Sequence, residues 1–102
     1  MKDNDTQAMG KCSVLGAVLH GAEALPVAVE VSLEDAPPSV LVVGMADASV
    51  QESRERVRSA LKASGFAVPP CRIVVSLEPG YLRKTGTGLD LPMAVGILAA
   101  SG

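Results

Sequence analysis

The glycine- and threonine-rich stretch from Gly80 to Thr87 is where phosphate chemistry would first be sought in this sequence. A P-loop has the pattern G-x-x-x-x-G-K-[ST], in which a lysine and a hydroxyl residue directly follow the second glycine. Here Lys84 precedes Gly86, and Thr87 and Gly88 follow it. The order does not fit a P-loop, and the stretch is interpreted as a flexible strand-to-helix loop. Backbone amides at the start of the next helix could still hold an anion without any motif.

Groups for nucleophilic or acid–base catalysis are sparse. A serine nucleophile needs a base beside it, and the one histidine, His20, precedes Gly21 at the end of an apolar run, as a solvated turn residue does. Glu78 and Asp90 flank the glycine-rich loop. We expect Asp90 to be the N-cap of the following helix, a role that stabilises by ~1 kcal/mol. The sequence predicts no catalytic residue.

A metal site and a disulfide framework are not expected either. Cys12 and Cys71 are isolated, whereas zinc takes about four ligands at characteristic spacing. The opening residues are polar, and the apolar runs Cys12–Leu19 and Leu91–Ala100 are shorter than the ~20 residues that span a bilayer. We therefore expect a soluble cytoplasmic chain without a membrane partner.

Positive charge gathers locally. The chain has 9 basic and 11 acidic residues and a net charge of −2, which argues against a general polyanion binder. Arg54, Arg58 and Lys62, called the basic stripe below, recur at helical spacing and share one face. This stripe is either a solvated face or a contact surface. With Arg83 and Lys84 it supplies the candidate contacts to DNA phosphates or to a protein partner.

The elements that would position these groups follow from hydrophobic periodicity. With 102 residues, 48% of them hydrophobic, the chain is long enough for one core and too apolar to be disordered. Residues 1–10 are interpreted as a disordered tail or expression scar, and 11–102 as the domain. The predicted strands are Cys12–Leu19, Leu25–Leu33, Val40–Val43 and Arg72–Leu77. Two helices are predicted, one between Asp47 and Gly65 and one from about Leu89 to Ser101.

Local signals set the ends of these elements. Asp47 is expected to cap the first helix, and Gly65 to end it in a Schellman motif with Phe66 packing back on Leu61. Pro26 favours an edge or entering position for its strand, since proline cannot donate to a ladder. The order β-β-β-α-β-α predicts an α+β two-layer sandwich with both helices on one face.

Several segments together resemble one family, the magnesium-chelatase-like AAA+ ATPases of the competence protein ComM (YifB) type, in their amino-terminal domain. The resemblance covers about residues 11–102. The segments that carry it are Val43–Ala48, Glu52–Ala60 (ESRERVRSA), Ser64–Phe66, Pro69-Pro70, Arg72-Ile73, Leu89–Pro92 (LDLP) and Gly96–Gly102.

The resemblance implies a Lon-protease-like (ribosomal-protein domain-2-like) fold, a two-layer sandwich whose β-α-β crossover is left-handed, against the usual rule. Because the sequence stops directly after an apolar helix, which leaves little to cover the rest of the sheet, we expect this domain to be incomplete at its C-terminal end. The resemblance further implies that an AAA+ core follows residue 102. That core would use ATP and Mg, for which this domain has no motif. Family members form hexameric rings, and ComM is a DNA helicase that promotes branch migration in natural transformation.

The resemblance also implies that one activity of related domains is missing here. Active Lon-type peptidases carry a serine nucleophile where the loop meets the helix, and Gly88 stands at that place here. Peptidase activity is therefore not expected. The sequence departs from the family at Tyr81, which replaces an acid, and at Thr87-Gly88, where Pro-Ser is common. These departures put in doubt any contact that the loop 78–88 makes in relatives.

Three hypotheses remain for the function. The leading one is a non-catalytic domain that contributes DNA engagement or subunit contacts to a ring ATPase, with DNA, its own AAA+ core and neighbouring subunits as partners. The second is an assembly module without a DNA role, which uses apolar edges such as Cys12–Leu19. The third is a degenerate peptidase domain that binds a peptide or nucleotide near Gly86–Asp90.

Overall fold

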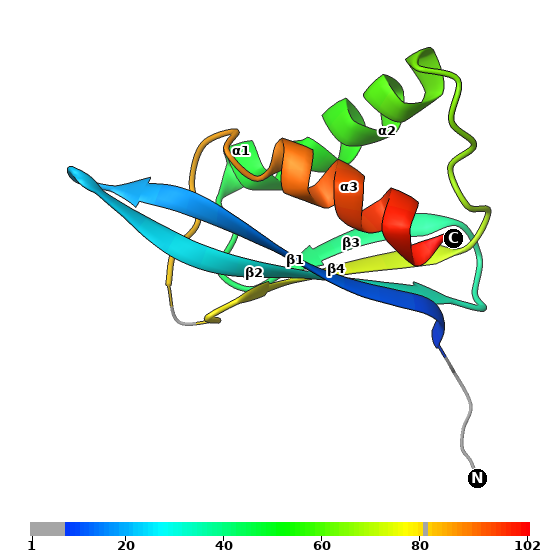
Figure 1. The fold of residues 1–102 in the computed structure, drawn as a ribbon, viewed down its shortest axis with the longest axis horizontal. Coiled ribbons are helices and arrows are strands. Elements are labelled where there is room, and N and C mark those ends of the chain that lie inside the picture. The colour runs from blue at the N-terminus through cyan, green and yellow to red at the C-terminus, as the bar shows by residue number, and fades with distance from the viewer. Residues whose placement is uncertain (1–7, 81) are drawn as a thin grey trace, which may run out of the picture.

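The computed structural model describes residues 8–80 and 82–102. A four-stranded sheet carries the helices on one of its faces (Figure 1), so the predicted two-layer α/β architecture is confirmed. The Lon-like topology and the hand of the crossover stay predictions. In chain order the elements are β1 (Ala8–His20), β2 (Glu23–Glu34), β3 (Ser39–Val43), α1 (Ala48–Gln51), α2 (Ser53–Ala63), β4 (Arg72–Glu78) and α3 (Asp90–Ala100).

The sheet has the order β1-β2-β4-β3, which makes β1 and β3 its edge strands. β2 pairs antiparallel with both β1 and β4. β3 pairs parallel with β4, and α1 and α2 lie in the connection between these two strands. A parallel pair needs such a crossover, because its strands cannot be joined by a tight turn.

The core lies between the helices and one face of the sheet. Alternation in β2 and β4 turns every second residue towards the helices, and these residues are almost fully buried. Their partners are apolar side chains on one side of α2 and α3. The buried apolar residues of these four elements are Val27, Val29, Val31, Leu33, Val57, Leu61, Ile73, Val75, Leu77, Met93, Ile97 and Ala100.

Within residues 8–80 and 82–102, no helix lies against the opposite face of the sheet, which is called the open face below (Figure 1). Leu15 and Leu19 of β1 are 73% and 75% exposed there, and Leu41 and Val43 of β3 are 44% and 47% exposed. The register places all four side chains on this face, since successive residues of a strand alternate between faces.

The predicted C-terminal end is confirmed for the helix that α2 completes. Gly65 has φ +87, the N–H of Phe66 donates to the carbonyl of Leu61 (2.9 Å), and the N–H of Gly65 donates to that of Lys62 (3.0 Å). These two bonds define a Schellman motif. The predicted single helix is however divided at Glu52 into α1 and α2.

Two strand predictions need correction. β1 begins at Ala8, so residues 8–10 belong to the sheet and not to a tail, because their pairing extends to Glu34 of β2. Residues 1–7 lie outside the described residues. Pro26 belongs to an internal strand, but β4 pairs with β2 only from Ala28 to Glu34. Pro26 therefore has a neighbouring strand on one side alone, and its missing N–H costs no ladder bond there.

Among the described residues, no helix combines the length and the apolar character needed to cross a membrane.

Gly96 allows α3 to lie close to the sheet. A Cβ atom at this position would stand 2.6 Å from Cγ2 of Val31, a side chain that is fully buried and stiff at χ1. We expect Gly96→Ala to lower the free energy of unfolding by about 1 kcal/mol, because overpacking costs about 1–3 kcal/mol and the better helix propensity of alanine returns about 1.

Urea denaturation would measure this effect. Gly80→Ala is the control, since a Cβ at Gly80 meets no atom within 4 Å. Combining Gly96→Ala with Val31→Ala should cost less than the sum of the single changes, because the second removes the obstructing methyl group. Strict additivity would show that Gly96 is not a packing constraint.

Candidate functional site

The strongest polar cluster joins α2 to the start of α3. Nε of Arg56 donates to Oδ2 of Asp90 at 2.7 Å, and an Nη2 hydrogen bond reaches Oδ1 at 3.1 Å. The hydroxyl of Ser53, which is buried, donates to the same carboxylate. This set is called the Arg56–Asp90 cluster below. Two-point binding of a guanidinium to a carboxylate is among the strongest hydrogen-bonded arrangements in proteins.

The cluster holds Asp90 in its charged form. The hydrogen bond from Arg56 lowers the pKa of Asp90 below its ordinary value of 3.8, and the bond from Ser53 acts in the same direction against the effect of burial. The same contact with Asp90 raises the pKa of Arg56. A carboxylate neutralised by arginine accepts protons poorly, so the cluster is suited to fixing positions and not to general-base work.

The predicted N-cap role of Asp90 is wrong. α3 begins at Asp90 itself, and Leu89, whose side chain makes no capping hydrogen bond, holds the N-cap position. The carboxylate of Asp90 turns towards Arg56 because a charged, two-point partner outcompetes a single backbone amide. The other predicted cap is confirmed, since Oδ1 of Asp47 accepts the N–H of Val50 at 3.0 Å.

A second branch of hydrogen bonds fixes the loop before α3. The hydroxyl of Ser49 donates to Oδ1 of Asp47 at 2.7 Å and accepts the N–H of Gly86 at 2.8 Å. Nη2 of Arg56 donates to the carbonyl oxygen of Ser49 at 2.9 Å. The loop is thus anchored on α1, although the sequence suggested a flexible connection. The Gly86 N–H donates to a side chain of the protein itself and is therefore no evidence for an anion site.

Lys84 is enclosed by the same loop. Its side chain is fully buried and its ammonium group donates to the carbonyl oxygen of Pro79. Its main-chain N–H and C=O pair with Met45 and Asp47, at 2.9 and 3.1 Å. Burial lowers the pKa of Lys84, and the charge of Glu78 opposes this shift. The enclosed ammonium group cannot reach a phosphate, which removes Lys84 from the candidate contacts.

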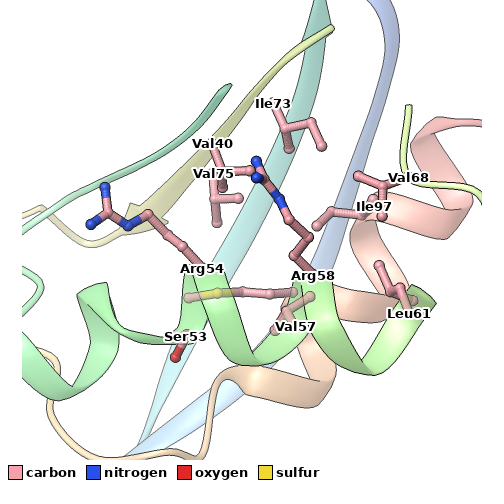
Figure 2. Close-up of a pocket in the computed structure, with 11 residues that line it drawn as sticks. Val40, Ser53, Arg54, Val57, Arg58, Leu61, Val68, Ile73, Val75 and Ile97 are labelled. Carbon is pink, nitrogen blue, oxygen red and sulfur yellow. The ribbon is translucent and has the colours of Figure 1, made fainter. Parts of the chain in front are cut away.

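The basic stripe keeps its predicted place along α2. Figure 2 shows the side chains of Arg54 and Arg58 reaching from α2 towards β3 and β4, across a narrow apolar crevice that Val40 and Val75 also line. Nε of Arg54 donates to the carbonyl of Gln51 at 3.0 Å. Nε of Arg58 is buried and has no partner among the described residues.

The two remaining candidate cations, Lys62 and Arg83, lie in different surroundings. Lys62 is exposed and lines a second crevice together with Arg58. Arg83 is exposed on the loop before α3, and its charge adds to a lowering of the Asp47 pKa that is caused mainly by the hydrogen bond from Ser49. The structure therefore brings Arg54 and Arg58 to one crevice and places Arg83 near the start of α1.

Gly88 lies beside β1. A Cβ atom here would meet the carbonyl oxygen of Ala17 at 3.2 Å, and residues 85–88 form a shallow hollow with Ala17–Leu19. Gly88 brings no nucleophile to this hollow. Among residues 8–80 and 82–102, no group of three or more His, Cys, Asp or Glu residues could hold a metal ion.

Asp90 was singled out from the sequence, but the residues that bind it and anchor the loop before α3 were missed. Ser49, Ser53 and Arg56 are spaced i, i+4, i+7 and therefore share one helical face. This polar face was a detectable signal. The partner Asp90 is separated from Arg56 by 34 positions in the sequence, and helical periodicity cannot predict a contact over such a separation.

The fold and sequence together place the chain in a family. The sequence profile of the family described as subunit ChlI of Mg-chelatase matches residues 29–102, and the chain belongs to this family of magnesium-chelatase-like proteins.

Named relatives agree with this assignment. The chain is 42% identical over 90 residues to the protein YifB of Salmonella typhimurium, covering 83% of this chain and 18% of the relative. It is 46% identical over 81 residues to the competence protein ComM of Haemophilus influenzae, covering 79% and 16%. It is 33% identical over 93 residues to the protein Rv2897c of Mycobacterium tuberculosis, covering 91% and 18%. The chain thus spans less than a fifth of the length of these relatives.

Removing the charge of Asp90 should loosen the contact between α2 and α3. We expect Asp90→Asn to lower the free energy of unfolding by about 1 kcal/mol, because the charge-assisted bonds are replaced by neutral ones in a part-exposed site. Thermal and urea unfolding would measure the change. Asp35→Asn, at an exposed carboxylate in the turn before β3, is the matched control and should have little effect. Equal effects would contradict the role of the cluster.

The contribution of Asp90 should also depend on pH. Its folded pKa lies below 3.8, so the stabilisation is fully present above pH 3.8 and is lost as the pH falls through the lowered folded value. The difference in unfolding free energy between the wild type and Asp90→Asn should therefore shrink towards zero in strong acid. Urea titrations at a series of acid pH values would show this. A difference that does not change with pH would contradict it.

Proposed function

We propose that this chain is a non-catalytic domain of a ComM-like AAA+ ATPase, and that it joins the ATPase core and neighbouring subunits through the open face of its sheet. The observation that carries this proposal is the exposure of Leu15 and Leu19, about three-quarters each, on the outer side of β1. The membership in the ChlI family and the similarity to ComM support the identity of the parent protein.

The arm formed by β1 and β2 makes this surface prominent. β4 pairs with β2 only from Ala28 to Glu34, so the hairpin beyond Ala28 is two-stranded and projects past the rest of the sheet (Figure 1). On its inner side Gly16 lies close to Leu89 and Pro92 of the helical layer. Its outer side carries Leu19, and Leu15 lies at its base, opposite Ala28.

An arm of this kind is energetically unfavourable when no other domain or subunit covers it. A two-stranded ribbon is marginally stable in water, and large apolar side chains gathered on one surface are typical of protein contact sites. Covering Leu15 and Leu19 with another domain or subunit would remove this apolar area from water and hold the hairpin in place. The open face is therefore best suited to assembly.

The chemistry of the parent protein is proposed to lie elsewhere. The resemblance supports an AAA+ core that uses ATP and Mg, a cytoplasmic hexameric ring, and DNA branch migration in natural transformation by the whole ring. This domain would take no part in hydrolysis, because Lys84 is enclosed and the Gly86 amide is bound to Ser49. DNA is then engaged by the ring as a whole.

The paired change Leu15→Ser/Leu19→Ser in the complete gene product tests the assembly role. We expect subunit association to weaken by about tenfold or more, since two apolar anchors leave the contact. Size-exclusion chromatography with light scattering, at several protein concentrations and with ATP, would measure it. Leu91→Ser is the matched control, because Leu91 is 72% exposed but belongs to α3 in the helical layer.

Two outcomes would overturn the proposal. An unchanged association constant in the paired variant would exclude the open face as the contact. Reading the coding region downstream of codon 102 tests the parent protein independently. A G-x-x-x-x-G-K-[ST] loop there would support the AAA+ core, whereas an immediate stop codon would remove the ATPase and helicase parts of the proposal.

A further inference from the structure

The edge of the sheet at β3 has main-chain groups without a neighbouring strand. In the parallel ladder the N–H of Ser39 donates to the carbonyl of Cys71, so Ser39, Leu41 and Val43 direct their main-chain groups to β4. The N–H and C=O groups of Val40 and Val42 therefore turn outward. Within the described part of the chain, β3 is the last strand on this side of the sheet.

The protein itself supplies a hydrogen-bond partner for only part of the outward main-chain groups at this edge. Nε2 of Gln51 donates to the carbonyl oxygen of Val42 at 3.0 Å. The outward groups of Val40 and the N–H of Val42 have no strand beside them, and such a row can pair with an added strand. β3 is short, with 5 residues, so the edge would accept a correspondingly short segment.

Positive charge stands next to this edge on the helix side. Arg54 and Arg58 extend from α2 towards β3, and in Figure 2 the guanidinium group of Arg54 stands clear of the apolar side chains that line the crevice. Neither has an ion-pair partner among the described residues, where Arg56 and Arg72 make the salt bridges. Nε of Arg58 is buried and lacks an acceptor. Guanidinium groups without an ion-pair partner favour an incoming carboxylate, because charge-assisted hydrogen bonds are stronger than neutral ones.

On the other side of the same edge the surface is apolar. Leu41 and Val43 point to the open face and are 44% and 47% exposed. A strand added to β3 would alternate its side chains between the two faces of the sheet. Every second residue would then meet Arg54 and Arg58, and the residues between would cover Leu41 and Val43.

We infer that the free edge of β3 binds a short extended segment of another protein in which acidic and apolar residues alternate. This surface is separate from the leucines of β1 and does not rest on the assembly role proposed above. A peptide is favoured over DNA because its backbone can pair with the outward groups of β3, whereas DNA could use the arginines alone.

A fluorescein-labelled peptide in which glutamate and valine alternate is the probe, with a lysine–valine peptide as its charge-reversed counterpart. Fluorescence anisotropy with the whole chain should give saturable binding of the acidic peptide only. Arg54→Gln/Arg58→Gln should weaken this binding by about tenfold or more, as expected when charge-assisted bonds are lost. Lys11→Gln, at an exposed cation of the opposite edge strand β1, is the control and should leave the affinity unchanged.

Val40→Pro separates strand pairing from plain charge attraction. Proline at this position removes one outward N–H and leaves the ladder to β4 intact, which edge strands tolerate. The Val40→Pro change should weaken binding of the acidic peptide by several-fold. Amide chemical shifts of the wild-type chain give an independent readout, since the signals of Val40 and Val42 should move most when the peptide is added.

Several results would overturn the inference. These are no saturable binding of the acidic peptide, an equal loss in Lys11→Gln, or shift changes that spare Val40 and Val42. Tighter binding of a single-stranded DNA oligonucleotide, with the same dependence on the two arginines and none on Val40→Pro, would assign the stripe to nucleic acid. The Leu15→Ser/Leu19→Ser variant should bind the peptide normally, so failure of the assembly role would be recognised separately.

Discussion

The ion pair between Arg56 and Asp90 fixes the two helices that cover the sheet. α2 and α3 bury the valines of β2 and β4 only if both lie on the same face at a set distance from each other. Apolar packing alone is tolerant of small slides between helices, whereas a two-point contact of guanidinium and carboxylate is directional. The arrangement of the core therefore depends on the polar contact between Arg56 of α2 and Asp90 of α3.

The same contact organises the loop before α3. Arg56 also holds the carbonyl of Ser49, and the hydroxyl of Ser49 holds the amide of Gly86. Polar groups that could have bound a substrate are thus used to connect the helices and the loop. What the domain still offers to other molecules is surface: the leucines of β1 on the open face, and the edge of β3 beneath the basic stripe.

Local patterns in the sequence predicted most of the fold. Alternation in Leu25–Leu33 and Arg72–Leu77 located two strands to within a few residues, and Gly65 marked a helix end, because these signals depend on neighbours along the chain. The roles of Asp90 and Lys84 were missed for the opposite reason. Asp90 has a partner 34 residues away, and Lys84 is enclosed because its segment bridges to Ala46. Tertiary partners of this kind override local preference.

The position of α3 in the chain has a consequence for folding during synthesis. β1 and β2 are adjacent in sequence and can pair early, as hairpins form within microseconds. The core has to wait for Met93 and Ile97, which are supplied by α3 and leave the ribosome after every strand has emerged. Until then the part of the helical face that α3 covers remains in water, as the open face does. The interval before α3 docks is the period in which this chain most needs protection from aggregation.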